Sequence, residues 1–97
     1  MTLAKLDLSA LYEKARVSFA ECAAEQEVLI VEETGESIGS IVLKDEWVKV
    51  QFSGRDKKHY TTETRLAIHS RSGDRIGYYC HHEDEAGGYI DQYLVFE

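Results

Sequence analysis

The run Cys80-His81-His82, followed by the acidic residues Glu83 to Glu85, combines the side chains that most often bind metal ions. Thiolate, imidazole and carboxylate groups stand next to one another here. In a strand, however, adjacent side chains point to opposite faces, so His81 and His82 cannot readily share one ion. We therefore predict that no metal is bound, and that both histidines lie at the polar end of a strand.

A second group, Asp45, Glu46 and Lys49, approximates the acidic and lysine residues of a nuclease strand. That chemistry needs a Glu-x-Lys pair on one strand face, whereas the spacing of Glu46 and Lys49 places the two side chains on opposite faces. Neither cysteine is paired with a histidine and an orienting acid, and no glycine-rich loop has phosphate-binding spacing. We predict no catalytic residue, no cofactor and no enzymatic activity.

The segment 83–88 places three acidic residues, Glu83, Asp84 and Glu85, ahead of Ala86 and two glycines. These carboxylates are too closely bunched for a calcium loop, which spaces its ligands at alternate positions and ends on a distant glutamate. Two interpretations stay open. The segment is a solvated hairpin turn, as most charge runs are, or it is an acidic projection that binds an arginine-rich surface of a partner.

The charge is strongly acidic and unevenly distributed. Eleven Lys and Arg residues stand against 18 Asp and Glu, a formal net charge of −7. Residues 1–50 carry −5 and residues 51–97 carry −2, although 53–75 is locally basic at +3. Nucleic acid would be repelled by most of this surface, because phosphate binding depends on concentrated Lys and Arg. A basic protein is the better matched partner.

The N-terminal part has the apolar spacing of an amphipathic helix from Leu8 to about Gln26. Steps of three and four residues join Leu8, Leu11, Tyr12, Ala15, Phe19 and Cys22. Asp7 or Ser9 can supply the capping oxygen. This stripe is expected to pack into the core.

After Gln26 the apolar period changes to alternation, which is typical of strands separated by turns rich in Gly, Asp and Ser. The predicted strands are 27–32, 37–43, 47–52, 59–69, 75–82 and 89–96. The links between successive predicted strands are short, which implies hairpins, because neighbouring parallel strands need long crossover connections. The sequence thus predicts one α+β domain over residues 1–97, with one N-terminal helix packed on one face of a five- to six-stranded antiparallel meander sheet.

Alternation divides the strand residues between two faces. The face assigned to the helix carries Val48, Val50, Phe52, Leu66, Ile68, Ile76, Tyr78, Cys80, Ile90, Leu94 and Phe96. The opposite face is polar with aromatics, and carries Trp47, Lys49, Gln51, Glu63, Arg65, Ala67, His69, Tyr79, His81, Tyr89, Asp91, Tyr93 and Val95. One helix covers one face only, so the second face is left for water or a partner.

The compartment is predicted from what the chain lacks. The longest aliphatic run, Val28 to Val31, is far short of a membrane span. The first ten residues show no apolar core of signal-peptide length. The two cysteines, Cys22 and Cys80, form no CxxC pair and are expected to be free thiols. We therefore expect a cytoplasmic protein.

The resulting hypothesis is a small acidic protein-binding module, an inhibitor or immunity-type protein that blocks a functional site on a basic partner, such as a toxin or a nucleic-acid-processing protein. Tyr, Trp and Arg are enriched at binding hot spots. The predicted partner-binding residues are Trp47, Arg65, Tyr79, Glu83, Asp84, Glu85, Tyr89 and Tyr93. A subunit that self-associates as a homodimer through the open face is the first alternative, and a small enzyme or ligand-binding domain is the second.

Overall fold

The computed structural model of the protein describes residues 6–55 and 59–97. Three residues of the predicted loop 53–58 lie outside this range. The elements run in the order α1 (Leu8–Glu25), α2 (Glu27–Thr34), a 3-10 turn η2 (Ile38–Ser40), β1 (Val42–Phe52), β2 (Tyr60–His69), β3 (Arg75–Asp84) and β4 (Tyr89–Phe96). None of the described helices is long and apolar enough to cross a membrane.

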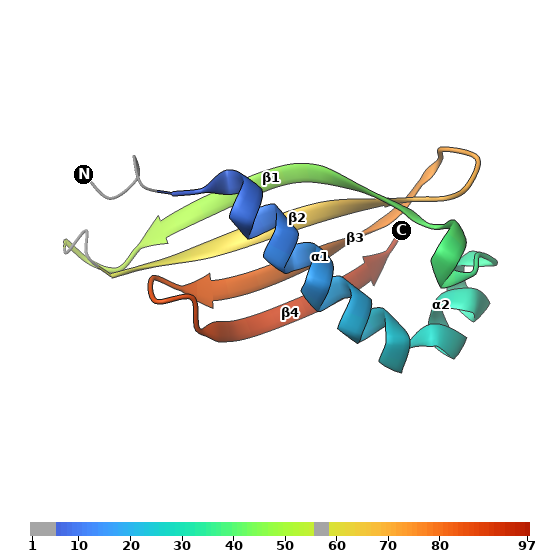
Figure 1. The fold of residues 1–97 in the computed structure, drawn as a ribbon, viewed down its shortest axis with the longest axis horizontal. Coiled ribbons are helices and arrows are strands. Elements are labelled where there is room, and N and C mark those ends of the chain that lie inside the picture. Colours follow the sequence, from blue (N-terminus) through green and yellow to red (C-terminus); the bar gives the residue numbers. More distant parts are fainter. Residues whose placement is uncertain (1–5, 56–58) are drawn as a thin grey trace.

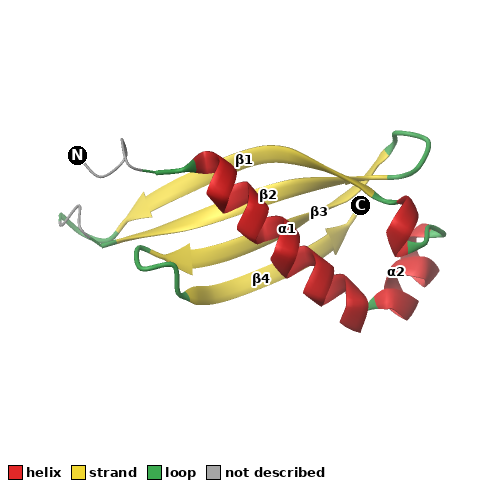
Figure 2. Ribbon diagram, in the orientation of Figure 1, coloured by secondary structure: helices red, strands yellow, loops and turns green. Residues whose placement is uncertain are grey.

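The four strands form an antiparallel sheet in the order β1-β2-β3-β4, and α1 crosses one of its faces diagonally (Figure 1). Figure 2 shows α1 in front of the sheet and α2 beside one end of it. The prediction of an α+β meander is therefore confirmed. The predicted number of strands and the prediction of a single helix are wrong.

The helix α1 follows directly from its sequence. Asp7 is its N-cap, and Asp7 Oδ1 accepts a hydrogen bond from the Ala10 N–H at 3.1 Å. Every fourth residue from Leu11 to Ala23 is buried, which makes one continuous apolar stripe. Two of these four residues are alanines, so the helix can approach the sheet closely. Ala15, Phe19 and Ala23 of this stripe form one buried cluster with Ile30, Leu66, Ile68 and Tyr79.

The segment predicted as a first strand, 27–32, is instead the helix α2. A short run such as Val28 to Val31 fits either a buried strand or a buried helix, because four residues are too few to define a period. The helix ends at Gly35, which adopts a left-handed conformation with φ of 71° and donates its N–H to the Val31 carbonyl. Of the residues in α2, only Ile30 is buried.

The predicted strands 37–43 and 47–52 are one strand, β1, preceded by η2. The residues between them, Lys44 to Glu46, were predicted as a turn. They lie within β1, where the register shifts so that Asp45 is opposite Leu66 and Trp47 is opposite Arg65. Glu46 is the extra residue of a β-bulge, which bends a strand without ending it.

Two further bulges change which side chains face α1. Ile76 is the extra residue in β3, between Arg75 opposite His69 and Gly77 opposite Ile68. Ile90 is the extra residue in β4. A bulge inverts the alternation beyond it. The assignment of Tyr78 and Cys80 to the helix face, and of Tyr79, His81 and Tyr89 to the open face, is therefore wrong.

Candidate functional site

The face of the sheet opposite α1, called the open face below, is organised around the guanidinium group of Arg65. Its central carbon lies 4.5 Å from the ring centroid of Trp47 and 3.8 Å from that of Tyr78. Lys49 Nζ lies 4.5 Å from the same Trp47 ring. Both aromatic rings therefore make cation–π contacts within the chain.

Carboxylates pair with the two arginines of this face, Arg65 and Arg75. Glu46, the bulged residue of β1, pairs with Arg75 and lies 3.9 Å from Arg65. Arg75 also donates from Nε to Glu97 at 2.8 Å. The hydrogen bonds to Glu46 and Glu97 raise the pKa of Arg75. These contacts tie β1, β3 and the end of β4 together across the sheet.

A second group on the open face is centred on Glu63. Its Oε1 lies 2.6 Å from His82 Nε2 and accepts a hydrogen bond from the Tyr93 hydroxyl at 3.3 Å. Burial alone would raise the pKa of Glu63, but the hydrogen bond and charge of His82 outweigh it, so this pKa is lowered. The ionised carboxylate is thus the stabilised form.

The lowered pKa of Glu63 predicts an acid-dependent contribution to stability. A carboxylate whose pKa is lowered by folding contributes fully above its unfolded pKa, near pH 4.5, and loses this contribution as the pH falls through the folded value. Glu63→Gln should therefore lower the free energy of unfolding at pH 7. The difference from wild type should shrink towards pH 3, as urea unfolding at both pH values would measure. A difference that stays constant with pH would contradict this assignment.

Cys80 lies beneath this network and is buried. Its sulfur accepts a hydrogen bond from Arg65 Nε at 3.3 Å. Burial raises the pKa of the Cys80 thiol, and the hydrogen bond from Arg65 only partly opposes this. Cys22 is half-buried, and burial followed by the charge of Glu25 raises its pKa as well. Both thiols are free, and neither is in the electropositive, accessible surrounding that makes cysteine reactive.

The helix side of the sheet holds a buried polar group next to the N-terminal half of α1. Glu83 is 5% exposed, and its Oε2 lies 2.8 Å from Lys14 Nζ and 3.4 Å from His81 Nε2. Thr62 and Thr64 are the cross-strand neighbours of Glu83 and His81, and both are buried. The pair between Lys14 and Glu83 ties α1 to the β3–β4 hairpin.

The predicted partner-binding residues do not form one surface. Trp47, Arg65 and Tyr93 lie on the open face as predicted. Tyr79 does not, because it is fully buried beneath α1, where its ring packs edge-on against Phe19 and its hydroxyl donates to Gln92. Burial is the largest cause that raises the pKa of Tyr79. Tyr89 is exposed on the helix side, with its ring 6.0 Å from that of His81.

The three acidic residues of the loop also separate. Glu83 is buried as described, whereas Asp84 caps the turn by accepting hydrogen bonds from the N–H groups of Ala86 and Gly88 at 2.9 and 2.7 Å. Of the three, only Glu85 is exposed, at the tip of the hairpin. The interpretation of this loop as a projecting cluster of three acids is therefore wrong.

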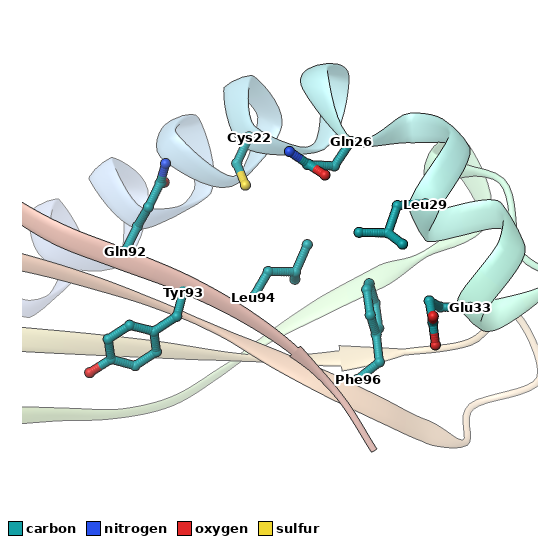
Figure 3. Close-up of a pocket in the computed structure, with 8 residues that line it drawn as sticks. All are labelled: Cys22, Gln26, Leu29, Glu33, Gln92, Tyr93, Leu94 and Phe96. Atoms are coloured by element: carbon teal, nitrogen blue, oxygen red, sulfur yellow. The ribbon is translucent and has the colours of Figure 1, made fainter.

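A groove that was not predicted lies between the helices and the edge strand β4. Its larger part has a volume of about 430 Å³ and is lined by Cys22, Gln26, Leu29, Glu33, Gln92, Tyr93, Leu94 and Phe96. Figure 3 shows the side chains of Leu29, Leu94 and Phe96 turned towards its interior, and the ring of Tyr93 directed away from it. The groove thus has an apolar floor made by α2 and β4.

The groove continues along β4 towards Tyr89. A smaller part of about 140 Å³ shares Cys22 and Gln92 with the larger one, and adds Ser18, Glu21, Glu25 and Tyr89. We call the two parts together the edge groove. It runs between α1 and β4 and opens to solvent.

The charge around the edge groove is one-sided. Residues 17–43 contain six glutamates and no Lys or Arg. Glu21, Glu25, Glu27, Glu32 and Glu33 form no ion pair with any residue that the structure describes. Among them α2 exposes Val28, Leu29 and Val31, at 72%, 43% and 44%. On the open face, by contrast, the cations of Arg65 and Lys49 contact the aromatic rings.

Within residues 6–55 and 59–97, no group of three or more His, Cys, Asp or Glu side chains is placed to hold a metal ion. The fold and grooves thus define a two-layer α+β domain with an acidic, partly apolar helical side. No protein-family model, curated protein or solved structure matches this chain.

Proposed function

We propose that the protein is a small acidic protein-binding module of the inhibitor or immunity type, which binds a basic partner and blocks a functional site on it. The observation that carries this proposal is the exposure of Val28, Leu29 and Val31 among glutamates that have no described ionic partner. Exposed apolar groups rimmed by polar ones mark interaction sites. Together with the edge groove, these residues form the proposed binding surface.

The chemistry of this surface selects the kind of partner. Carboxylates steer and orient a surface rich in Lys and Arg, while apolar side chains provide the affinity once water is excluded. An acidic partner would be repelled, and so would nucleic acid. The open face supports the proposal less well, because Arg65 and Lys49 already cover the ring of Trp47.

The proposal predicts which variants lose the partner. The protein is used to capture binding proteins from the cells that make it, and the captured protein is then purified and titrated calorimetrically at several salt concentrations. Val28→Asp combined with Val31→Asp should weaken the complex by about 1 to 3 kcal/mol, because apolar anchors are lost. Wild-type affinity should also fall as salt is raised. Both residues are exposed, so the melting temperature should change little.

Trp47→Ala is the matched control, since it removes an aromatic side chain from the open face. Its affinity for the captured partner should equal that of wild type. Loss of binding in Trp47→Ala, with wild-type binding in the α2 variant, would contradict the proposal. A homodimer at micromolar concentration that Trp47→Ala dissociates would identify the self-associating subunit instead.

A further inference from the structure

The two edges of the sheet differ in how they are protected. Edge strands expose unpaired N–H and C=O groups, and proteins usually guard them with charges, bulges or covering groups. β1 has all three devices. Glu46 forms a bulge, Lys44 and Asp45 add charge, and Arg16 donates to the Leu43 carbonyl at 3.2 Å and to Asp45 Oδ1 at 2.6 Å.

β4 is guarded far less. Its eight residues contain one charged side chain, Asp91, and no proline, and its bulge lies near the start of the strand. The Glu97 N–H donates to the Ile76 carbonyl at 2.9 Å. Because hydrogen bonding alternates along an antiparallel strand, the backbone groups of Phe96, Leu94 and Gln92 point away from β3. The Gln92 N–H indeed donates to the side chain of Asp91, at 2.8 Å.

The helical layer extends further than the sheet on this side. Figure 1 shows the C-terminal end of α1 projecting beyond β4, with α2 continuing from it. The edge groove lies beneath this projection, so the outer backbone of β4 and the apolar floor of the groove adjoin. Gln92, Leu94 and Phe96 line the groove with their side chains, and the same three residues present their backbone outwards.

We propose that the partner contributes an extended segment that pairs with β4 as a fifth strand. Alternate side chains of this segment enter the edge groove. Among these groove-facing side chains, apolar ones lie over Leu94 and Phe96, and Lys or Arg ones face Glu21, Glu25 and Glu33. The inference rests on the proposed function, since it states how a basic partner binds this surface. A second copy of the chain is the poorer occupant, because pairing β4 with β4 would bring two acidic grooves together.

The test uses a synthetic lysine peptide of nine residues with threonine at the even positions. Lysine and valine take turns at the odd positions, so that both kinds of side chain face the edge groove. Calorimetry measures its affinity, and amide hydrogen exchange by NMR locates it on the protein. At saturation the exchange of the Leu94 and Phe96 amides should slow by roughly tenfold or more, because new interstrand hydrogen bonds protect them. The same peptide N-methylated at alternate residues should not bind, and neither should its glutamate counterpart.

Matched charge variants test the orientation. Glu21→Lys combined with Glu33→Lys reverses two charges that line the edge groove, whereas Glu27→Lys combined with Glu32→Lys reverses two exposed charges that do not line it. We expect the first pair of substitutions to lower the affinity for the lysine peptide by about tenfold, and the second pair to lower it by less than about threefold. Melting temperatures show whether both variants are folded.

The other outcomes separate this inference from the proposed function. Equal binding of the N-methylated peptide, or protection outside β4, would overturn strand addition while an acidic docking surface for a basic partner stands. Strand addition would also be overturned if the lysine peptide did not bind at about 1 mM, because specific complexes have a much lower Kd. A homodimer whose Leu94 and Phe96 amides are protected without peptide would show that a second copy occupies the edge.

Discussion

Phe19→Ala should lower the free energy of unfolding by about 3 to 5 kcal/mol, as measured by urea unfolding at pH 7. Phe19 is 5% exposed, and its ring packs edge-on against Tyr79 with the centroids 5.5 Å apart. Truncation would leave a cavity between α1 and the middle of the sheet, where the neighbouring side chains can collapse only partly. Much of the contact between the two layers would be lost.

Two controls bracket this effect. Glu13→Ala changes an exposed residue of the same helix and should alter the unfolding free energy by less than about 0.5 kcal/mol. Phe52→Ala should cost only about 1 to 2 kcal/mol, because Phe52 is half-buried at the end of β1 against Tyr60. A Phe19→Ala variant as stable as Glu13→Ala would show that α1 does not pack as described.

Gly77→Ala should be comparably severe, at about 3 kcal/mol or more. A Cβ atom on Gly77 would lie 2.2 Å from the Val95 carbonyl oxygen and 3.1 Å from the Phe96 Cα, both of them backbone atoms of β4. A flexible side chain could move aside, but a paired strand cannot do so without breaking its ladder. We expect the variant to unfold at lower urea and to lose amide protection along β3 and β4.

Gly39→Ala is the matched control, since a Cβ atom there would meet nothing within 4 Å. Its stability should equal that of wild type or slightly exceed it, because alanine restricts the unfolded chain. Equal stability of the Gly77 and Gly39 variants would contradict the close approach of β3 and β4.

The sequence was a good guide wherever a pattern extended over many residues. The spacing from Leu8 to Cys22 covers about four turns, so it identified α1 and most of the stripe that packs against the sheet. Leu8 is the exception, because it is 54% exposed. The turn-forming residues at 53–58, 70–74 and 83–88 identified the three links between the paired antiparallel strands. Trp47 and Arg65 were correctly predicted on the open face. No bulge lies between Trp47 and Val48, or between Arg65 and Leu66, so the side chains alternate regularly there.

The sequence was a poor guide wherever a single bulged residue shifts the alternation of side chains along a strand. Ile76 packs against the core and so does Tyr79, three positions later, which regular alternation does not allow. Only the bulge at Ile76 permits both, and bulges have no reliable sequence signal. Regular alternation extended from Ile76 therefore assigns Tyr78 and Cys80 to the helix face and Tyr79 and His81 to the open face. The structure has the reverse.

The periodicity of apolar residues could not predict the edge groove. It depends on α2 being helical and on α1 reaching past β4, and both are consequences of packing between segments far apart in the chain. Val28 to Val31 did carry a signal. A run of four large apolar residues cannot all be buried on one side of a short helix, so a helical interpretation would have predicted exposed apolar surface.

The order in which the elements are synthesised has a consequence on the ribosome. Phe19 and its main aromatic contact, Tyr79, are 60 residues apart in the sequence. At about 5 to 20 residues per second, α1 exists for roughly 3 to 12 seconds before β3 is made. During that time its apolar stripe has no sheet to pack against, and an isolated helix of this length is only marginally stable in water. The nascent chain should therefore be a substrate for chaperones that hold apolar segments, and release should follow the synthesis of β3.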